Sequence, residues 1–300
     1  MVFFSVVIPT YNRSNFLPNT INSVLHQNFF DFEILIIDDG STDNTEEIIK
    51  SYIQSDNRIN YFKIKNSERG AARNLGIQKA NGKWIVFLDS DDVFLSDHLF
   101  HIKSLIEKFS EISIFTTAYN FNEDGRIYNS AVNILKSQLY DYQLLLKGNP
   151  FACNICVKKN ALKKIIPFPE NRMYSGMEDW IFLFTNSWIQ DFYHSDKITV
   201  QMNEHPHRSM RFNTDIIQKR INATQYIKTA FKLSKSEKRK LQGYSYYFFA
   251  IHYYLDGSNF KSFSNSLKAL LNLGLKEKIL TLVIKGIIGR KWVKKIKNSR

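Results

Sequence analysis

The chain has 300 residues, of which 44% are hydrophobic and 14% aromatic, a composition that supports a packed core and excludes a disordered chain. Its charge is unevenly spread: residues 1–204 hold 20 Lys and Arg against 24 Asp and Glu (20 − 24 = −4), whereas residues 205–300 hold 21 against 4 (21 − 4 = +17). An acidic front part suits a metal site, and a basic tail suits a polyanion, either nucleic acid or anionic lipid.

Strands and helices are predicted to alternate through the first part of the chain. Apolar runs predict buried strands over 2–8, 32–37, 59–64 and 84–88. Helices are expected between them, over about 14–26 with Ser14 as its cap, after Ser41 or Thr42, and over about 69–80. Short connections between alternating elements predict an α/β fold with a mostly parallel sheet and right-handed crossovers.

The pattern becomes mixed further along the chain. We expect helices over about 96–109, 138–147 and 180–188, strands over 112–119, 151–158 and 192–202, and a hairpin over 120–129. From Thr214 onward only helical patterns appear, and the basic charge is concentrated there. The sequence therefore predicts one α/β domain over 1–210 and a helical basic C-terminal extension over 211–300.

Polar motifs follow the carboxyl ends of the predicted strands. They are Pro9-Thr10-Tyr11-Asn12-Arg13, Asp38-Asp39-Gly40-Ser41 and Asp89-Ser90-Asp91-Asp92, while Arg69 and Arg73 open the helix after the third strand. Such strand ends converge on one ligand-binding crevice. Closely packed carboxylates need a positive partner such as a divalent cation, and arginine matches phosphate geometry. The residues alone therefore predict a nucleotide diphosphate with a metal, although residues 89–92 can also be read as a polar turn after a core strand.

Taken together, these segments resemble the family-2 inverting glycosyltransferases of the GT-A fold. The resemblance rests on residues 6–13, 36–43, 72–76 and 87–92, in the family's order and spacing, and recurs at 175–184 and 199–211. It implies a nucleotide-binding half over 1–95 and an acceptor-binding half over 96–210. It also implies transfer of a sugar from a UDP-linked donor to a glycan or lipid-linked acceptor hydroxyl, in surface polysaccharide biosynthesis.

The resemblance implies roles for individual residues. Asp39 resembles the acid that contacts uracil, and Pro9, Thr10, Tyr11 and Arg13 are expected beside the nucleotide. Either Arg69 or Arg73 is expected near the pyrophosphate; the spacing around Gly70 departs from the family and leaves the role of Arg69 open.

A second group of residues is expected around a cation. Asp89, Ser90 and Asp91 match the family's Asp-x-Asp signature, with Asp91 on Mn²⁺ or Mg²⁺ and Asp89 near the ribose or the metal. His205 is expected to approach the metal or the diphosphate, and Arg208 to bind the β-phosphate.

The pair Glu178-Asp179 resembles the family's Glu-Asp motif, in which the aspartate acts as general base and the glutamate lies at the donor site. An inverting displacement needs a base that takes the proton of the acceptor hydroxyl. The alternative is that both acids only cap a helix, because acids are common in a first helical turn.

The N-terminus lacks the basic start and cleavage site of a signal peptide, and no apolar run reaches the roughly 18 residues of a membrane span. Two cysteines, Cys153 and Cys156, imply no disulfide framework, which fits a reducing cytoplasm. The basic amphipathic tail can lie on an anionic membrane surface, or it can be a helical appendage with solvated lysines. No stacking platform for nucleic acid is present, so we expect none as a partner.

We therefore expect a cytoplasmic protein, which is peripheral on the inner face of the cell membrane if its basic tail binds lipid and not if the tail is only a helical appendage. Two alternatives to a glycosyltransferase stay open. One is a catalytically inactive GT-A module that binds a nucleotide and docks through its basic tail. The other is a nucleotidyltransferase, which shares the sheet and the metal but gives no reason for a base at Asp179.

Overall fold

The computed structural model describes residues 2–163, 165–205, 208 and 215–290. It forms two compact units, the first made of Met1–Tyr142 with Asn149–His205 and the second of Gln143–Gly148 with Pro206–Arg300. The predicted domain boundary at residue 210 lies outside the described residues, and the domain division stays a prediction.

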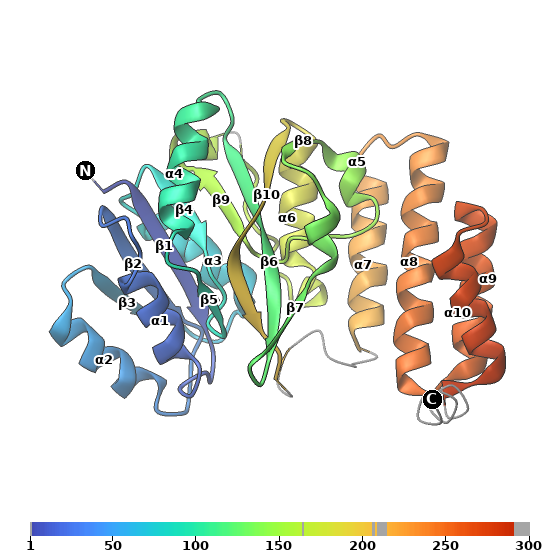
Figure 1. The fold of residues 1–300 in the computed structure, drawn as a ribbon, viewed down its shortest axis with the longest axis horizontal. Helices are drawn as coiled ribbons and strands as arrows, with labels where there is room; N and C mark the ends of the chain where they lie inside the picture. Colours follow the sequence, from blue (N-terminus) through green and yellow to red (C-terminus); the bar gives the residue numbers. More distant parts are fainter. Residues whose placement is uncertain (1, 164, 206–207, 209–214, 291–300) are drawn as a thin grey trace. The chain divides into compact units, whose positions relative to one another are not determined.

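A mixed sheet forms the centre of the first unit (Figure 1). Its strands lie in the order β3 (Ile59–Lys63), β2 (Phe32–Asp38), β1 (Phe4–Thr10), β4 (Trp84–Phe87), β9 (Ile155–Lys158), β6 (Ile114–Glu123), β10 (Phe192–Asn203) and β5 (Asp92–Phe94). In addition, β7 (Arg126–Asn129) pairs with β6, and β8 (Gln138–Tyr140) pairs with β10. The first four strands are parallel, with Val6 opposite Ile34 and Val86, so that their carboxyl ends share one edge.

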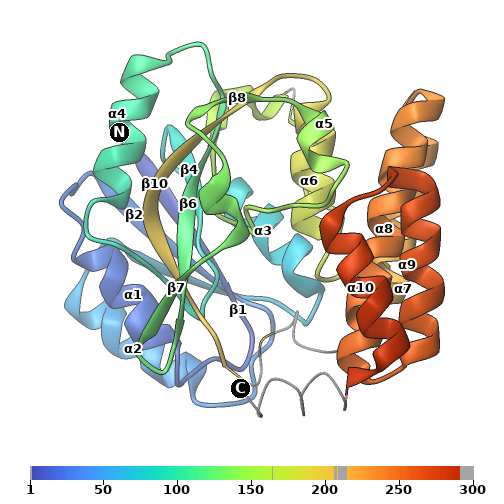
Figure 2. The same ribbon diagram turned by 45° about the vertical axis from the view of Figure 1, so that its right-hand side comes forward.

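Helices cover both faces of this sheet, which is why every residue of β1 and β2 is buried. The helices α1 (Leu17–Leu25) and α2 (Thr45–Ser55) lie on one face, and α3 (Glu68–Lys79) and α6 (Glu178–Ser187) on the other (Figure 2). Helix α4 (His98–Lys108) also belongs to the first unit, whereas all but the first residue of the short α5 (Tyr142–Leu145) belongs to the second. The arrangement confirms the predicted α/β fold class.

The structure corrects several predicted elements. The helix predicted over 138–147 was wrong in its first part, because residues Gln138–Tyr140 pair with β10 as an antiparallel strand, and only Tyr142–Leu145 is helical. The strand predicted over 151–158 begins only at Ile155 and runs antiparallel to β4 and β6. Helix α1 begins at Leu17, beside Pro18, which is favoured in a first turn, rather than directly after Ser14.

The second unit contains the predicted C-terminal helices: α7 (Asp215–Ala230), α8 (Lys235–Asp256), α9 (Asn259–Leu273) and α10 (Glu277–Ile288). Helix α8 packs against α7 and α9, and α10 packs against α9. Ser234 starts α8 with a capping box, in which its hydroxyl accepts from the Glu237 amide while the Glu237 carboxylate accepts from the Ser234 amide. None of the helices that the structure describes combines the length and apolar character required to cross a bilayer.

Candidate active site

The loops after β1 and β2 are tied to each other at the carboxyl edge of the sheet. Asn12, at a φ of 51°, donates its amide to the Ser41 hydroxyl (2.9 Å) and accepts the Thr42 amide with its side chain (2.8 Å). The Arg13 Nε lies 3.6 Å from the Asp91 carboxylate, which joins the loop after β1 to the Asp-x-Asp segment. Three of the motifs predicted to converge therefore lie together.

The predicted nucleotide residues of β1 differ in their exposure. Pro9 and Thr10 end the strand and are buried, and the Thr10 hydroxyl makes no hydrogen bond among the described residues. Tyr11 is 47% exposed at the start of the loop. An exposed aromatic ring next to a buried hydroxyl is a suitable place for a nucleobase, so their predicted role stays a prediction that the geometry permits.

The two aspartates that end β2 have different surroundings. Asp38 is fully buried and accepts hydrogen bonds from the Ser41 amide and the Tyr61 hydroxyl, both at 2.7 Å. Burial and this bond to Asp38 raise the pKa of Tyr61. Gly40, at a φ of 84°, makes the tight turn that lets these loops close. Asp38 therefore holds the loop together.

Asp39 instead accepts from the first turn of α3. Its two carboxylate oxygens receive the amides of Ser67 (2.6 Å) and Glu68 (2.9 Å). Burial raises the pKa of Asp39, although these backbone hydrogen bonds oppose the shift. A carboxylate oxygen can accept more than one hydrogen bond, so Asp39 can also accept from a nucleobase.

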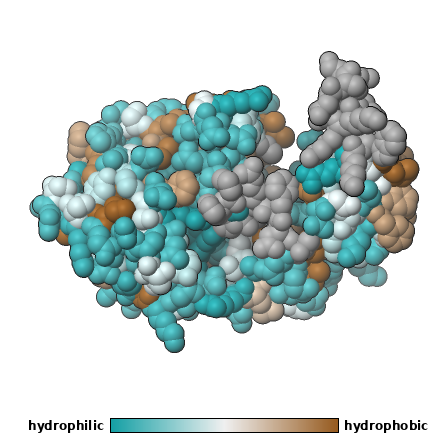
Figure 3. Space-filling model, turned by 90° about the horizontal axis from the view of Figure 1, so that it is seen from below, coloured by the Kyte–Doolittle hydropathy of each residue, from teal (hydrophilic) through white to brown (hydrophobic). Residues whose placement is uncertain are grey.

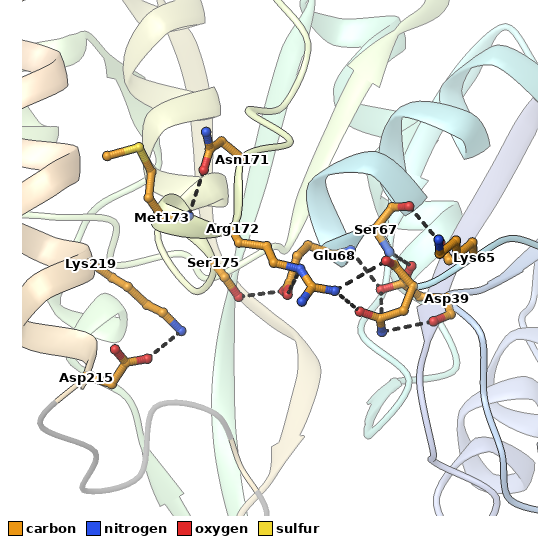
Figure 4. Close-up of polar contacts among 11 residues, drawn as sticks. Asp39, Lys65, Ser67, Glu68, Asn171, Arg172, Met173, Ser175, Asp215 and Lys219 are labelled. Carbon is orange, nitrogen blue, oxygen red and sulfur yellow. Dashed lines mark hydrogen bonds and ion pairs between the residues drawn. The ribbon is translucent and has the colours of Figure 1, made fainter.

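The same turn of α3 also holds the segment that leads to the predicted base (Figure 4). The Glu68 carboxylate accepts the Ser175 hydroxyl (2.9 Å) and lies 3.2 Å from the Arg172 Nε, while Arg172 also donates to Asn66. We call the contacts of Glu68 with Arg172 and Ser175 the Glu68 clasp.

Two further contacts fix this segment along α3. Asn74 exchanges hydrogen bonds with the backbone of Phe168 (2.9 and 3.0 Å). A Cβ on Gly70 would lie 2.1 Å from the Pro169 carbonyl oxygen, so only glycine permits this approach. Helix α3 thus positions the whole stretch that precedes Glu178.

Arg73 is the buried centre of the site. It is 1% exposed, and its guanidinium donates to Glu178 (2.8 Å) and to Asp89 (2.7 Å) while lying over the Phe168 ring. Although burial opposes the charge, the pKa of Arg73 is raised well above its usual value, and Asp89 and Glu178 contribute to that rise. Arg73 thus joins the end of β4 to the start of α6, and its predicted place near a pyrophosphate stays a prediction.

Glu178 and Asp179 are adjacent acids whose pKa values move apart. Burial opposes ionisation of Glu178, but Arg73 and Arg69 outweigh it and lower the pKa of Glu178. Burial and the neighbouring Glu178 charge raise the pKa of Asp179 to about 7. Such a separation of two neighbouring acids is typical of acid–base sites.

The Asp179 carboxylate is held from two sides, and the residue as a whole is half-buried. One oxygen accepts the Asn149 side chain (2.8 Å) and the other accepts the Trp180 amide (2.7 Å). Sequence reasoning missed Asn149, because it lies 30 residues before Asp179 in a stretch without a recognisable motif. Only its place between Gly148 and Pro150 marked a loop there.

A carboxylate and an imidazole meet at the predicted metal position. His205 Nε2 lies 3.0 Å from the Asp91 carboxylate, and the His205 ring stacks on Phe16 with ring centres 4.3 Å apart. Within the described ranges, no group of three or more His, Cys, Asp or Glu side chains is placed to hold an ion. An imidazole beside a carboxylate is acceptable for Mn²⁺-like ions and less apt for Mg²⁺, and a diphosphate and water would supply the other ligands of a bound ion.

Three predicted site residues remain, namely Ser90, Arg69 and Arg208, and each has a different position relative to the candidate site. Ser90 is buried and its carbonyl accepts the Thr20 hydroxyl (3.0 Å). Arg69 lies near enough to Glu178 to lower its pKa. Arg208 belongs to the second unit, so its predicted contact with the β-phosphate stays a prediction.

The edge of the parallel sheet brings together an acid-lined loop, an Asp-x-Asp segment and a paired Glu-Asp. This combination defines the class of the protein as a GT-A glycosyltransferase. Residues 5–166 match the family model of Glycosyl transferase family 2, and the chain belongs to that family. The family and fold predicted from the motifs are confirmed.

Relatives and solved structures agree with this assignment. An uncharacterized glycosyltransferase of Rickettsia bellii is 38% identical over 56% of this chain, but the chain spans only 24% of that protein's length. The GalNAc(5)-diNAcBac-PP-undecaprenol beta-1,3-glucosyltransferase of Campylobacter jejuni is 24% identical over 99% of this chain and 97% of its own. The crystal structure of S. aureus TarS 1-349 with UDP-GlcNAc has a TM-score of 0.67 at 18% identity, covering 95% of this chain and 84% of that one.

Proposed function

We propose that this glycosyltransferase moves a sugar from a UDP-linked donor, with inversion, to a hydroxyl of a glycan or lipid-linked acceptor in surface polysaccharide biosynthesis. The observation that carries the proposal is Asp179, a half-buried residue whose carboxylate is fixed by Asn149 and Trp180 and has a pKa of about 7. A pKa near the working pH is what a general base requires. The Campylobacter relative is named for a lipid diphosphate acceptor, and the TarS structure holds UDP-GlcNAc; both support the proposal.

The proposed reaction is a single displacement at the anomeric carbon. The acceptor oxygen forms a bond to that carbon while the bond to the diphosphate oxygen breaks, and the acceptor proton moves to Asp179. Arg73 keeps Glu178 ionised. Glu178 in turn raises the pKa of Asp179, which makes that carboxylate a stronger base.

We propose that Asp91 and His205 hold Mn²⁺ or Mg²⁺ and that Asp89 lies near the ribose or the ion. When bound, such an ion offsets the charge that grows on the departing diphosphate. Asp39, with Pro9, Thr10, Tyr11 and Arg13, would bind the nucleoside, and Asp39 would accept from the base.

A nucleotide-binding module without activity is the second candidate. Asp39, Asp89, Asp91 and Asp179 are all present, and a domain that had lost catalysis would have no use for the arrangement around Asp179.

The donor class can be tested by thermal unfolding with UDP, with and without Mn²⁺. At about 100 times its dissociation constant, a ligand of the folded state adds about 2.7 kcal/mol to the free energy of unfolding. We expect a metal-dependent rise in melting temperature with UDP, lost in Asp91→Ala and retained in Asp191→Ala, which removes an exposed acid. No rise with UDP, or an equal rise in Asp91→Ala, would count against the proposal.

The pH dependence of transfer tests the role of Glu178. Because Asp179 must be ionised to act as a base, kcat/KM is expected to rise with pH through about 7. Glu178→Gln removes the neighbouring negative charge, so the rise should shift to lower pH. An unchanged pH profile in this variant would show that another group limits the reaction.

A further inference from the structure

Helix α10 carries an apolar stripe on its outer face. Leu280, Ile284, Ile287 and Ile288 are 39%, 55%, 69% and 42% exposed, and their spacing places them on one side of the helix. The opposite side is buried in the second unit through Ile279, Leu282 and Gly286. The helix is therefore apolar on both sides, and its outer side is left exposed by the described part of this chain.

Further apolar side chains are exposed nearby in the sequence. Leu275, in the turn before α10, is 84% exposed, and Phe260 and Leu271 of α9 are 81% and 74% exposed. Figure 3 shows hydrophobic side chains over these C-terminal helices on a surface that is otherwise mainly hydrophilic. An exposed apolar group of this kind marks an interaction surface.

The stripe lies in the most basic part of the chain. Lys278 and Lys285 are seven residues apart, so both lie along the same border of the stripe on α10. Residues 276–300 hold 9 Lys and Arg and 1 Glu, so that 9 − 1 = +8. An apolar face with a basic border matches an anionic lipid surface in both chemistry and charge.

We infer that the outer face of α10 docks the protein on an anionic bilayer, with Leu280, Ile284, Ile287 and Ile288 entering the headgroup region. Charge decides against a second copy of the chain as the occupant, because residues 205–300 carry +17 and would face the same charge in a partner. The docking surface does not depend on how the donor binds. The inference rests on the proposed function in one respect only: a lipid-linked acceptor would explain why the enzyme needs to lie on a membrane.

Vesicle flotation with the full chain tests the inference. We expect binding to vesicles of phosphatidylcholine with phosphatidylglycerol, and much weaker binding to phosphatidylcholine alone. The double variant Ile284→Asn/Ile287→Asn should lose about tenfold or more in vesicle affinity, because two apolar side chains no longer enter the bilayer. Lys278→Glu/Lys285→Glu should lose a comparable factor, and its loss should shrink as salt increases.

Ile134→Asn is the matched control, because Ile134 is 80% exposed but belongs to the first unit. It should bind vesicles like the wild type, and circular dichroism should show that all variants are folded. Equal binding to neutral and anionic vesicles, or unchanged binding of the isoleucine double variant, overturns the inference. Sedimentation that shows self-association abolished by that variant, without vesicle binding, assigns the stripe to a second copy.

The donor proposal and the docking inference can fail separately. All these variants should keep the wild-type thermal response to UDP, because the substitutions lie outside the candidate active site. Vesicle binding without a UDP response would count against the donor proposal alone, and a UDP response without vesicle binding would count against the docking surface alone.

Discussion

Replacing Asp179 with asparagine is expected to lower kcat by about 10²- to 10⁴-fold, the range that a positioned general base contributes. Asparagine keeps the size of the side chain and can still accept the Trp180 amide, but it cannot take a proton from an acceptor hydroxyl. The measurement is single-turnover transfer to acceptor at saturating donor, which separates the chemical step from product release.

Donor binding distinguishes loss of the base from loss of the fold. The thermal response of Asp179→Asn to UDP and Mn²⁺ should match that of the wild type, because Asp179 is assigned to the acceptor side of the reaction. Asn149→Ala, which removes one partner of the Asp179 carboxylate, should lower kcat less than Asp179→Asn. A variant Asp179→Asn with full activity would remove this residue from the mechanism.

The substitution Arg73→Met is expected to lower the free energy of unfolding by about 3–5 kcal/mol, the cost of breaking a buried ion pair by removing one partner. Methionine fills much of the same volume, but it leaves Glu178 buried without its guanidinium and removes the link to Asp89. Urea unfolding of the variant and the wild type measures the difference.

Lys50→Met is the matched control for this loss of charge. Lys50 pairs with Glu46 on the surface of α2, and its removal should change stability little, because exposed ion pairs are screened by solvent. In Arg73→Met the pKa of Asp179 should also rise, because Arg73 lowers it in the wild type. Equal stability of Arg73→Met and wild type would mean that the Arg73 pairs contribute no net stability.

Much of the first unit could be predicted because its core strands are continuous apolar runs. Residues 4–10 and 32–38 are buried on both faces of the sheet, so their sequences are mainly apolar runs. Such runs are the pattern that predicts a buried strand. Strand β8 could not be predicted, since Gln138–Tyr140 becomes a strand only by pairing with Phe192–His194, far away in the sequence. Local pattern carries no information about such a pairing.

The same limit applies to the candidate site. Asp39, Asp89 and Asp91 follow strands directly, and a parallel sheet brings strand ends together, so sequence alone predicted their grouping. The bond between Arg73 and Glu178 joins residues 105 positions apart, and the sequence suggested only a phosphate for that guanidinium. Which of several acids an arginine meets depends on how α3 and α6 pack, which periodicity does not specify.

The Glu68 clasp has an energetic consequence, because one helical turn receives both Asp39 and the segment before Glu178. Two sites that share a structural element are thermodynamically linked, and linkage is reciprocal. If a bound donor steadies that turn, it also steadies the stretch that carries Asp179, and any change that loosens the stretch weakens donor affinity by the same factor. A bound donor would then raise the affinity for the acceptor, and a bound acceptor would raise the affinity for the donor by the same factor, through the first turn of α3.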